Sequence, residues 1–153
     1  MVKVLVAASL LWPALLAVAA WQQTGDRTPA WTRVVYFAGS RICHQRPERT
    51  FDTAGVEWPV CGRCSGLYLA APFGALVAVG ALARRRLPRQ PAWWLAVAAV
   101  PTALTLGLEW FSLAHVTNIG RFVAALPLGA MVAFLVVQAA AGPRGRIGYT
   151  GRR

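Results

Sequence analysis

The chain has 153 residues, the length of one domain. Of these residues 57% are hydrophobic and only 14% are charged, and the mean hydropathy is +0.48. Because a soluble domain averages about 25% charged residues, this composition excludes an ordinary water-soluble globular protein and predicts that lipid is the solvent. The net charge of +11 does not indicate nucleic-acid binding, since the basic residues form short clusters between apolar runs. We therefore expect a lipid bilayer as partner and no nucleic acid.

Four apolar segments are long enough to cross the hydrocarbon core of a bilayer, which takes about 20 helical residues. They cover approximately residues 4–21, 65–83, 92–110 and 122–141. Each contains one proline, which transmembrane helices tolerate better than soluble helices do. The pattern predicts an all-α fold: an integral membrane four-helix bundle that forms a single transmembrane domain over residues 1–141.

The first segment has two interpretations. Lys3 followed by an apolar run, with Ala17-Val18-Ala19 near its end, also resembles a signal peptide with a cleavage site. We favour a retained helix, because the run is longer than the usual signal core of about 7–15 residues. In both interpretations the following loop, residues 22–64, is exported.

The basic residues predict the orientation through the positive-inside rule. With both termini in the cytoplasm, the cytoplasmic side carries basic residues and no acidic ones: Lys3, Arg84, Arg85, Arg86, Arg89, Arg144, Arg146, Arg152 and Arg153. The opposite side has its arginines spread over a longer stretch, and all five acidic residues lie on or near it. We expect a multi-pass protein with loop 22–64 on the outer face and a basic, flexible cytoplasmic tail over residues 142–153.

The exported loop begins with an amphipathic pattern. Apolar residues recur at helical spacing on one face: Trp31, Val34, Val35, Ala38 and Ile42. This predicts a short additional helix that lies on the membrane surface or caps the bundle. A second, extended stretch is expected over residues 56–60.

All three cysteines lie in this loop or at its end. Cys43 and His44 follow the predicted short helix, and Cys61 and Cys64 form a Cys-x-x-Cys motif at the start of the second span. Thiolates and imidazole are the ligands that Zn²⁺ prefers, and a helix N-terminus favours the thiolate form. These four residues are the candidate metal ligands, with His115 as a possible replacement for His44.

Two other roles for the cysteines stay open. The exported side is oxidising, so two of the cysteines can form a purely structural disulfide in the loop, although three cysteines leave one thiol unpaired. Alternatively, the Cys61-x-x-Cys64 pair, with Cys43, is a redox site.

A second polar group is expected near the same face. Glu109 lies near the outer end of the third span, and His115, Asn118 and Arg121 follow in or after the next loop. Ionisable groups at membrane depth are costly and usually face the bundle interior, so they are functional candidates. An ion pair of Glu109 with Arg121 or Arg63 at the interface is the simpler explanation.

Several motifs resemble the signature of a prokaryotic membrane-protein family, catalogued as domain of unknown function 2085. They are Cys43-His44-Gln45, Arg49-Thr50-Phe51 and Cys61-Gly62-Arg63-Cys64-Ser65-Gly66-Leu67-Tyr68, followed by Asn118, Arg121 and Gly129. The resemblance covers roughly residues 40–130. It implies a prokaryotic cell-membrane protein with a cysteine–histidine site but no particular reaction, and it adds Gln45, Arg49, Arg63 and Tyr68 to the functional candidates.

Three hypotheses for the function follow. The leading one is a membrane protein that binds Zn²⁺ or another thiolate-preferring metal. The runner-up is a thiol–disulfide oxidoreductase with a quinone as cofactor. The third is a small-molecule or ion transporter or binder that uses Glu109, Arg121 and Arg63, and so short a chain would then form a homo-oligomer to enclose a path.

Overall fold

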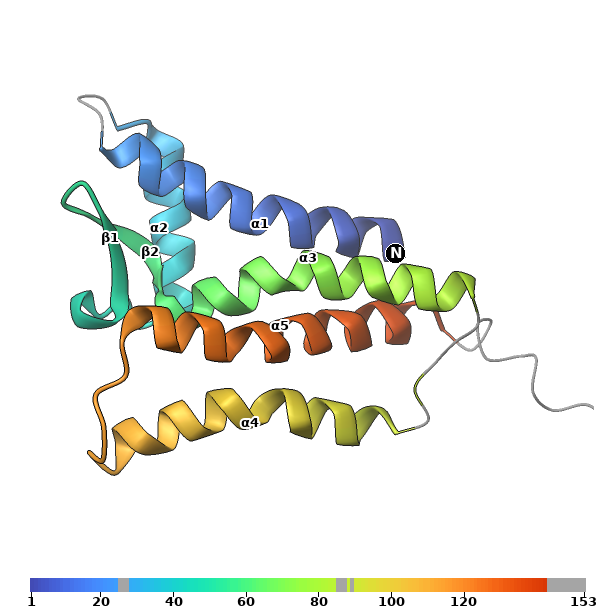
Figure 1. Cartoon of the computed structure of the whole chain (residues 1–153). Helices are drawn as coiled ribbons and strands as arrows, with labels where there is room; N and C mark the ends of the chain where they lie inside the picture. The colour runs from blue at the N-terminus through green and yellow to red at the C-terminus, as the bar shows by residue number, and fades with distance from the viewer. Residues whose placement is uncertain (25–27, 85–87, 89, 143–153) are drawn as a thin grey trace, which may run out of the picture.

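The computed structural model describes residues 1–24, 28–84, 88 and 90–142. Four long helices run alongside one another: α1 (Val2–Gln23), α3 (Gly62–Ala83), α4 (Pro91–Trp110) and α5 (Asn118–Ala140) (Figure 1). Each is long and apolar enough to cross a membrane. The expected all-α membrane four-helix bundle is therefore confirmed. Apart from Gly142, the expected basic tail lies outside the described residues.

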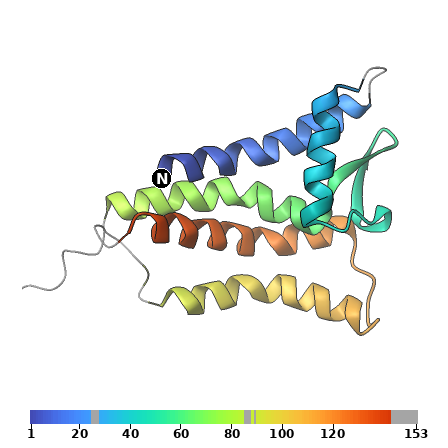
Figure 2. The same cartoon turned by 180° about the vertical axis from the view of Figure 1, so that it is seen from behind.

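Helices α3 and α5 form the centre of the bundle and run in the same direction. Backbone contacts hold them close: a Cβ placed on Gly66 would collide with the Phe122 carbonyl, and one on Gly74 with the Ala130 carbonyl. Such small residues allow close helix contact where lipid provides no hydrophobic driving force. Helix α1 covers α3 on one side and α4 covers α5 on the other, and the two figures agree on this order (Figure 2).

One end of the bundle carries a cap. Helix α2 (Ala30–Ile42) runs across the long helices, as a helix in the membrane plane would. It is followed by a single 3₁₀ turn, η1 (Pro47–Arg49), and by an antiparallel hairpin of β1 (Thr50–Thr53) and β2 (Val56–Cys61). The extended stretch expected at 56–60 lies within β2, whereas its pairing with β1 was not predicted.

The face by which α2 packs differs from the predicted apolar stripe. Thr32, Val35 and Gly39 are buried, while Val34 and Ile42 are 65% and 53% exposed. The reason is the close approach at Gly39, where a Cβ would collide with the Pro59 carbonyl of β2. Trp31 and Val35 of the predicted stripe pack inward, whereas Val34, Phe37 and Ile42 are left on the surface, where a lipid interface can take them.

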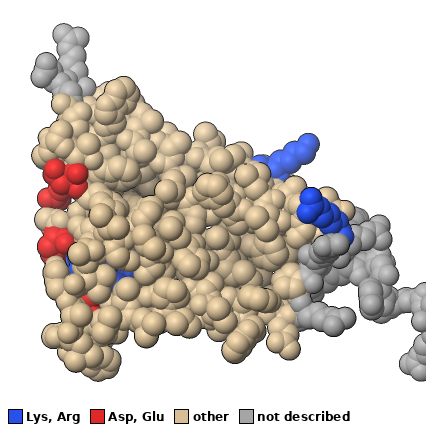
Figure 3. Space-filling model, viewed as in Figure 1, with Lys and Arg blue, Asp and Glu red and all other residues tan. Residues whose placement is uncertain are grey.

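Charge separates along the bundle axis. The acidic side chains in view gather at the end that carries α2 and the hairpin, and the middle of the surface is nearly uncharged (Figure 3). Lys3 at the start of α1 and Arg84 at the end of α3 lie at the opposite end, where these helix ends are found in Figure 1. The start of α1 and the end of α5 both lie at this second end. This arrangement is that of a chain crossing a membrane an even number of times.

Candidate functional site

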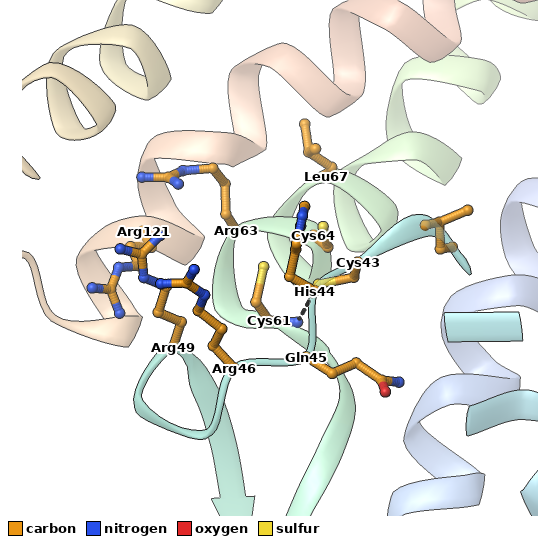
Figure 4. A pocket seen from close by; sticks show the side chains of 11 residues that line it. Cys43, His44, Gln45, Arg46, Arg49, Cys61, Arg63, Cys64, Leu67 and Arg121 are labelled. Atoms are coloured by element: carbon orange, nitrogen blue, oxygen red, sulfur yellow. Dashed lines mark hydrogen bonds between the residues drawn. The ribbon is translucent and has the colours of Figure 1, made fainter. Parts of the chain in front are cut away.

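The three cysteines meet at the junction between the cap and the bundle. Cys43 directly follows α2, Cys61 ends β2 and precedes α3, and Cys64 lies in the first turn of α3. Their sulfur atoms all lie within 4.8 Å of one another. Figure 4 shows them on the wall of one cavity (Figure 4). The predicted cysteine cluster is thus brought together by three different elements.

Local hydrogen bonds hold the Cys43 segment in place. The Cys43 backbone N–H donates to the Gly39 carbonyl at 2.9 Å, and this bond closes the last turn of α2. The Cys61 backbone N–H donates to Cys43 Sγ at 3.2 Å. This bond joins the two cysteine segments directly.

Gln45 acts as a clamp between α2 and β2. Its Nε2 donates to the Pro59 carbonyl at 2.6 Å and to the Tyr36 carbonyl at 3.0 Å. Its backbone has a positive φ of 44°, which turns the chain sharply after Cys43 and His44. The structure therefore gives this candidate site residue a positioning role.

The thiols lie against an apolar cluster, and their pKa values differ. Cys43 is buried in a cluster with Leu16 and Ala19 of α1, Val35 of α2 and Val60 of β2. The pKa of the Cys61 thiol is lowered to about 5, chiefly because the Cys64 side chain donates a hydrogen bond to its sulfur. Burial acts in the opposite direction but is outweighed, and the N-terminal position of Cys61 on α3 also favours the anion. One thiolate is thus favoured near neutral pH.

The two histidines are placed differently. His44 is exposed and lines the same cavity as the thiols, but its ring nitrogens do not belong to the group formed by the three sulfurs. His115 lines a separate cavity with Glu48, Arg49 and Glu109. In this conformation, the described residues that come together as possible metal ligands are the three cysteines.

The cavity beside the thiols has a volume of about 340 Å³ and is rich in arginine. Its basic lining residues are Arg46, Arg49, Arg63 and Arg121. No acidic side chain lines it among the residues that the structure describes. Arg46 was missed in the sequence, although it stands only two residues after His44 and just before the proline that starts η1.

An ionic network lies behind this cavity. Arg121 Nε donates to Glu109 Oε1 at 2.6 Å, a second Arg121 nitrogen pairs with the same carboxylate, and Arg63 Nη2 donates to Glu109 Oε2 at 3.2 Å. The side chains of Arg121, Glu109 and Arg63 are 3%, 8% and 17% exposed. The structure therefore contains both ion pairs that the sequence suggested for Glu109.

Asn118 connects this network to the cap. Its Nδ2 donates to the Thr50 carbonyl at 2.8 Å, and its Oδ1 accepts from Arg121 Nη1 at 2.6 Å. Arg121 Nη1 also donates to the Glu48 carbonyl at 3.3 Å. The start of α5 thus holds η1 and β1 in position over the thiols.

Tyr68 lies behind the cluster rather than in the arginine-lined cavity. Its ring packs edge-on against Trp12 of α1, with 6.1 Å between centroids, and it contacts the apolar cluster that includes Cys64. This candidate residue helps to join α1 to α3 beside the thiols.

Comparisons with known proteins agree with the motifs. A family model described as "Predicted membrane protein (DUF2085)" matches residues 43–135. An uncharacterised protein of Methanocaldococcus jannaschii is 30% identical over 105 residues, which are 67% of this chain and 66% of the relative. An uncharacterised protein of Methanothermobacter thermautotrophicus is 60% identical over 30 residues, 20% of this chain and 27% of the relative.

The chain thus spans just under two thirds of the first relative's length and about a quarter of the second's. No solved structure matches. The matched region contains the three cysteines, Glu109, Asn118 and Arg121, so it includes the whole cluster described above. The resemblance seen in the sequence is confirmed, and the chain belongs to the DUF2085 family of predicted membrane proteins.

Proposed function

We propose that this membrane protein binds a thiolate-preferring metal ion, Zn²⁺ or a related divalent ion, between Cys43, Cys61 and Cys64. The observation that carries the proposal is the approach of three sulfur atoms to within 4.8 Å of one another. Zn–S bonds of about 2.3 Å in a regular tetrahedron place sulfur atoms about 3.8 Å apart. The thiols need to close by only about 1 Å, which small side-chain rotations provide.

The chemistry of the donors also suits a metal. The lowered pKa at Cys61 favours the thiolate, the form that binds metal, and the N–H bond to Cys43 Sγ holds the second sulfur beside it. Three protein ligands leave one position of a tetrahedron open, and this position would face the arginine-lined cavity. His44 at the cavity wall is the proposed fourth ligand, unless solvent or a bound molecule takes its place.

The proposed orientation has both termini in the cytoplasm and the metal site at the outer face of a prokaryotic cell membrane. The support is the charge separation: Lys3 and Arg84 lie at the end opposite to the cysteines, and positive residues generally concentrate on the cytoplasmic side of membrane proteins.

Elemental analysis of the full-length protein, purified in detergent, tests metal binding. We expect stoichiometric metal in the wild type and its loss in Cys43→Ser, Cys61→Ser and Cys64→Ser. Ser40→Ala, an exposed change on α2, is the matched control and should retain the metal. His44→Ala distinguishes a histidine ligand from solvent. Metal content that is negligible in the wild type, or unchanged in the cysteine variants, would refute the proposal.

A second candidate function is thiol–disulfide exchange. The observation that favours it is the low pKa of Cys61, about 5, with Cys64 in the same motif and Cys43 within reach. Cys61 and Cys64 would lose two electrons and two protons to a quinone, forming a disulfide and a quinol. Maleimide labelling of intact membranes with and without reductant separates the two functions. A reversible Cys61–Cys64 disulfide supports exchange, whereas thiols that are reduced but protected until metal is removed support metal binding.

A further inference from the structure

The cavity beside the thiols contains more positive charge than its surroundings neutralise. Four guanidinium groups line it, and one carboxylate, Glu109, pairs with two of them. Within the described part of the chain, the Arg46 and Arg49 guanidinium groups have no ion pair. A cluster of this kind is costly without an anion, because like charges that share a small volume repel each other.

The arginines also retain unused hydrogen-bond donors. The Nε of Arg63 is buried and has no hydrogen-bond partner among the described residues. Arg121 is held by Glu109, Asn118 and the Glu48 carbonyl, so it supplies fixed charge rather than free donors. Arg46 and Arg49, whose guanidinium groups form no ion pair among the described residues, therefore supply the donors that face a guest, and Arg63 adds charge at the cavity wall. Guanidinium forks match the oxygen atoms of phosphate and carboxylate groups.

We infer that this cavity is a binding site for a phosphate group, with Arg46 and Arg49 as its ligands and Arg63 and Arg121, both held by Glu109, as fixed neighbouring charges. The count of charges favours phosphate over carboxylate. Four guanidinium groups and one carboxylate leave three positive charges around the cavity. A phosphate monoester carries about −1.5 to −2 at pH 7 and offsets most of that excess, whereas a single carboxylate offsets only one charge.

The position of the cavity makes it accessible to two sources of phosphate. It opens at the end of the bundle beside α2, which runs across the long helices as a helix at the membrane surface would. Both a soluble phosphate and the headgroup of a phosphatidic-acid-type lipid can reach this level. The shared chemistry is a phosphate monoester or inorganic phosphate, and the experiment distinguishes the sources. The inference does not depend on a metal, because the arginines form the site with or without one.

Isothermal titration of the full-length protein in detergent tests the inference with two phosphate probes, orthophosphate and a short-chain phosphatidic acid, and with acetate as the carboxylate comparison. We expect saturable binding of at least one probe, and a loss of affinity of about tenfold or more in Arg49→Ala. The affinity of Arg49→Lys should lie between those of the wild type and Arg49→Ala, because lysine keeps the positive charge but lacks the planar guanidinium group that binds two oxygen atoms. Binding of orthophosphate assigns a soluble source, and binding of the lipid alone assigns a headgroup.

Arg41→Gln is the matched control. It removes one positive charge at the same end, where Arg41 lies exposed over the Phe37 ring at 4.7 Å and outside the cavity lining. Its affinity should change less than about twofold, because exposed charges are screened. Should Arg49→Ala fail to fold, Arg46→Ala at an exposed position replaces it.

Three results would overturn the inference: no binding of either probe, equal losses in Arg41→Gln and Arg49→Ala, or acetate binding as tight as phosphate binding. The Cys43→Ser protein keeps this test separate from the proposed metal function. If it lacks metal and still binds phosphate, the anion site stands by itself. If the wild type holds metal but binds neither probe, the anion site fails while the metal function stands.

Discussion

Substitution of Glu109 by glutamine is expected to be among the most destabilising single changes at the end of the bundle that carries the cap. The carboxylate of Glu109 neutralises Arg63 and Arg121, and the three side chains are 8%, 17% and 3% exposed. Glutamine has nearly the same shape but no charge, so the two guanidinium groups would remain buried without a counter-charge.

The magnitude follows from this burial. Removing one partner of a buried ion pair lowers the free energy of unfolding by about 3–5 kcal/mol, because the remaining charge is desolvated and no longer has an opposite charge to compensate. Here one carboxylate serves two arginines, so we expect the upper part of that range. The cost should fall in Glu109→Gln/Arg63→Met, where one of the unpaired charges is also removed. We expect a coupling free energy of about 1 kcal/mol or more between the two sites.

The assay is reversible unfolding of the purified protein in mixed micelles, followed by far-UV circular dichroism as the fraction of denaturing detergent rises. Glu57→Gln is the control, because Glu57 is an exposed carboxylate at the same end of the molecule. Its free energy of unfolding should change by less than about 0.5 kcal/mol. If Glu109→Gln were no more destabilising than Glu57→Gln, the ion pairs would not stabilise the bundle and the electrostatic argument would be wrong.

Two further predictions concern helix packing and thiol acidity. Gly74→Ala should lower the unfolding free energy by about 1–3 kcal/mol, because its Cβ would collide with the Ala130 carbonyl. Gly80→Ala, whose Cβ meets nothing within 4 Å, should not destabilise, and equal melting temperatures for the two variants would contradict the close approach of α3 and α5. In metal-free protein the rate of Cys61 alkylation, followed by mass spectrometry, should have its midpoint near pH 5, because its pKa is about 5. Cys64→Ala should move that midpoint upward by removing the hydrogen bond that lowers the pKa most, and a wild-type midpoint near the ordinary thiol value of about 8.5 would refute the assignment.

The order and type of the helices follow from the sequence alone, because hydropathy and length are local properties. A segment such as Gly62–Ala83 must be helical in lipid, where each backbone polar group needs an internal partner. The motif around Cys43 and the Cys61-x-x-Cys64 pair also predicted a cysteine cluster, and the three sulfur atoms do come together. Periodicity likewise predicted a helix where α2 lies.

Other features depended on contacts between distant segments. The buried face of α2 was decided by Gly39 meeting β2, which no apolar stripe encodes. The cavity at the site required η1, which α5 holds in place through the bond of Arg121 to the Glu48 carbonyl. This is why Arg46 was missed: its neighbours in sequence do not predict that Arg63 and Arg121 lie across the same cavity.

The sequence by itself determined a four-helix membrane protein with its cysteines at one end, because composition and spacing act locally along the chain. The tertiary structure alone decided that three sulfurs meet within 4.8 Å and that His115 lines a different cavity. It also decided that the arginines outnumber the carboxylates around one cavity. Distances and charge balance arise from residues far apart in the chain, and only the packing of α3, α5 and the cap brings those residues together.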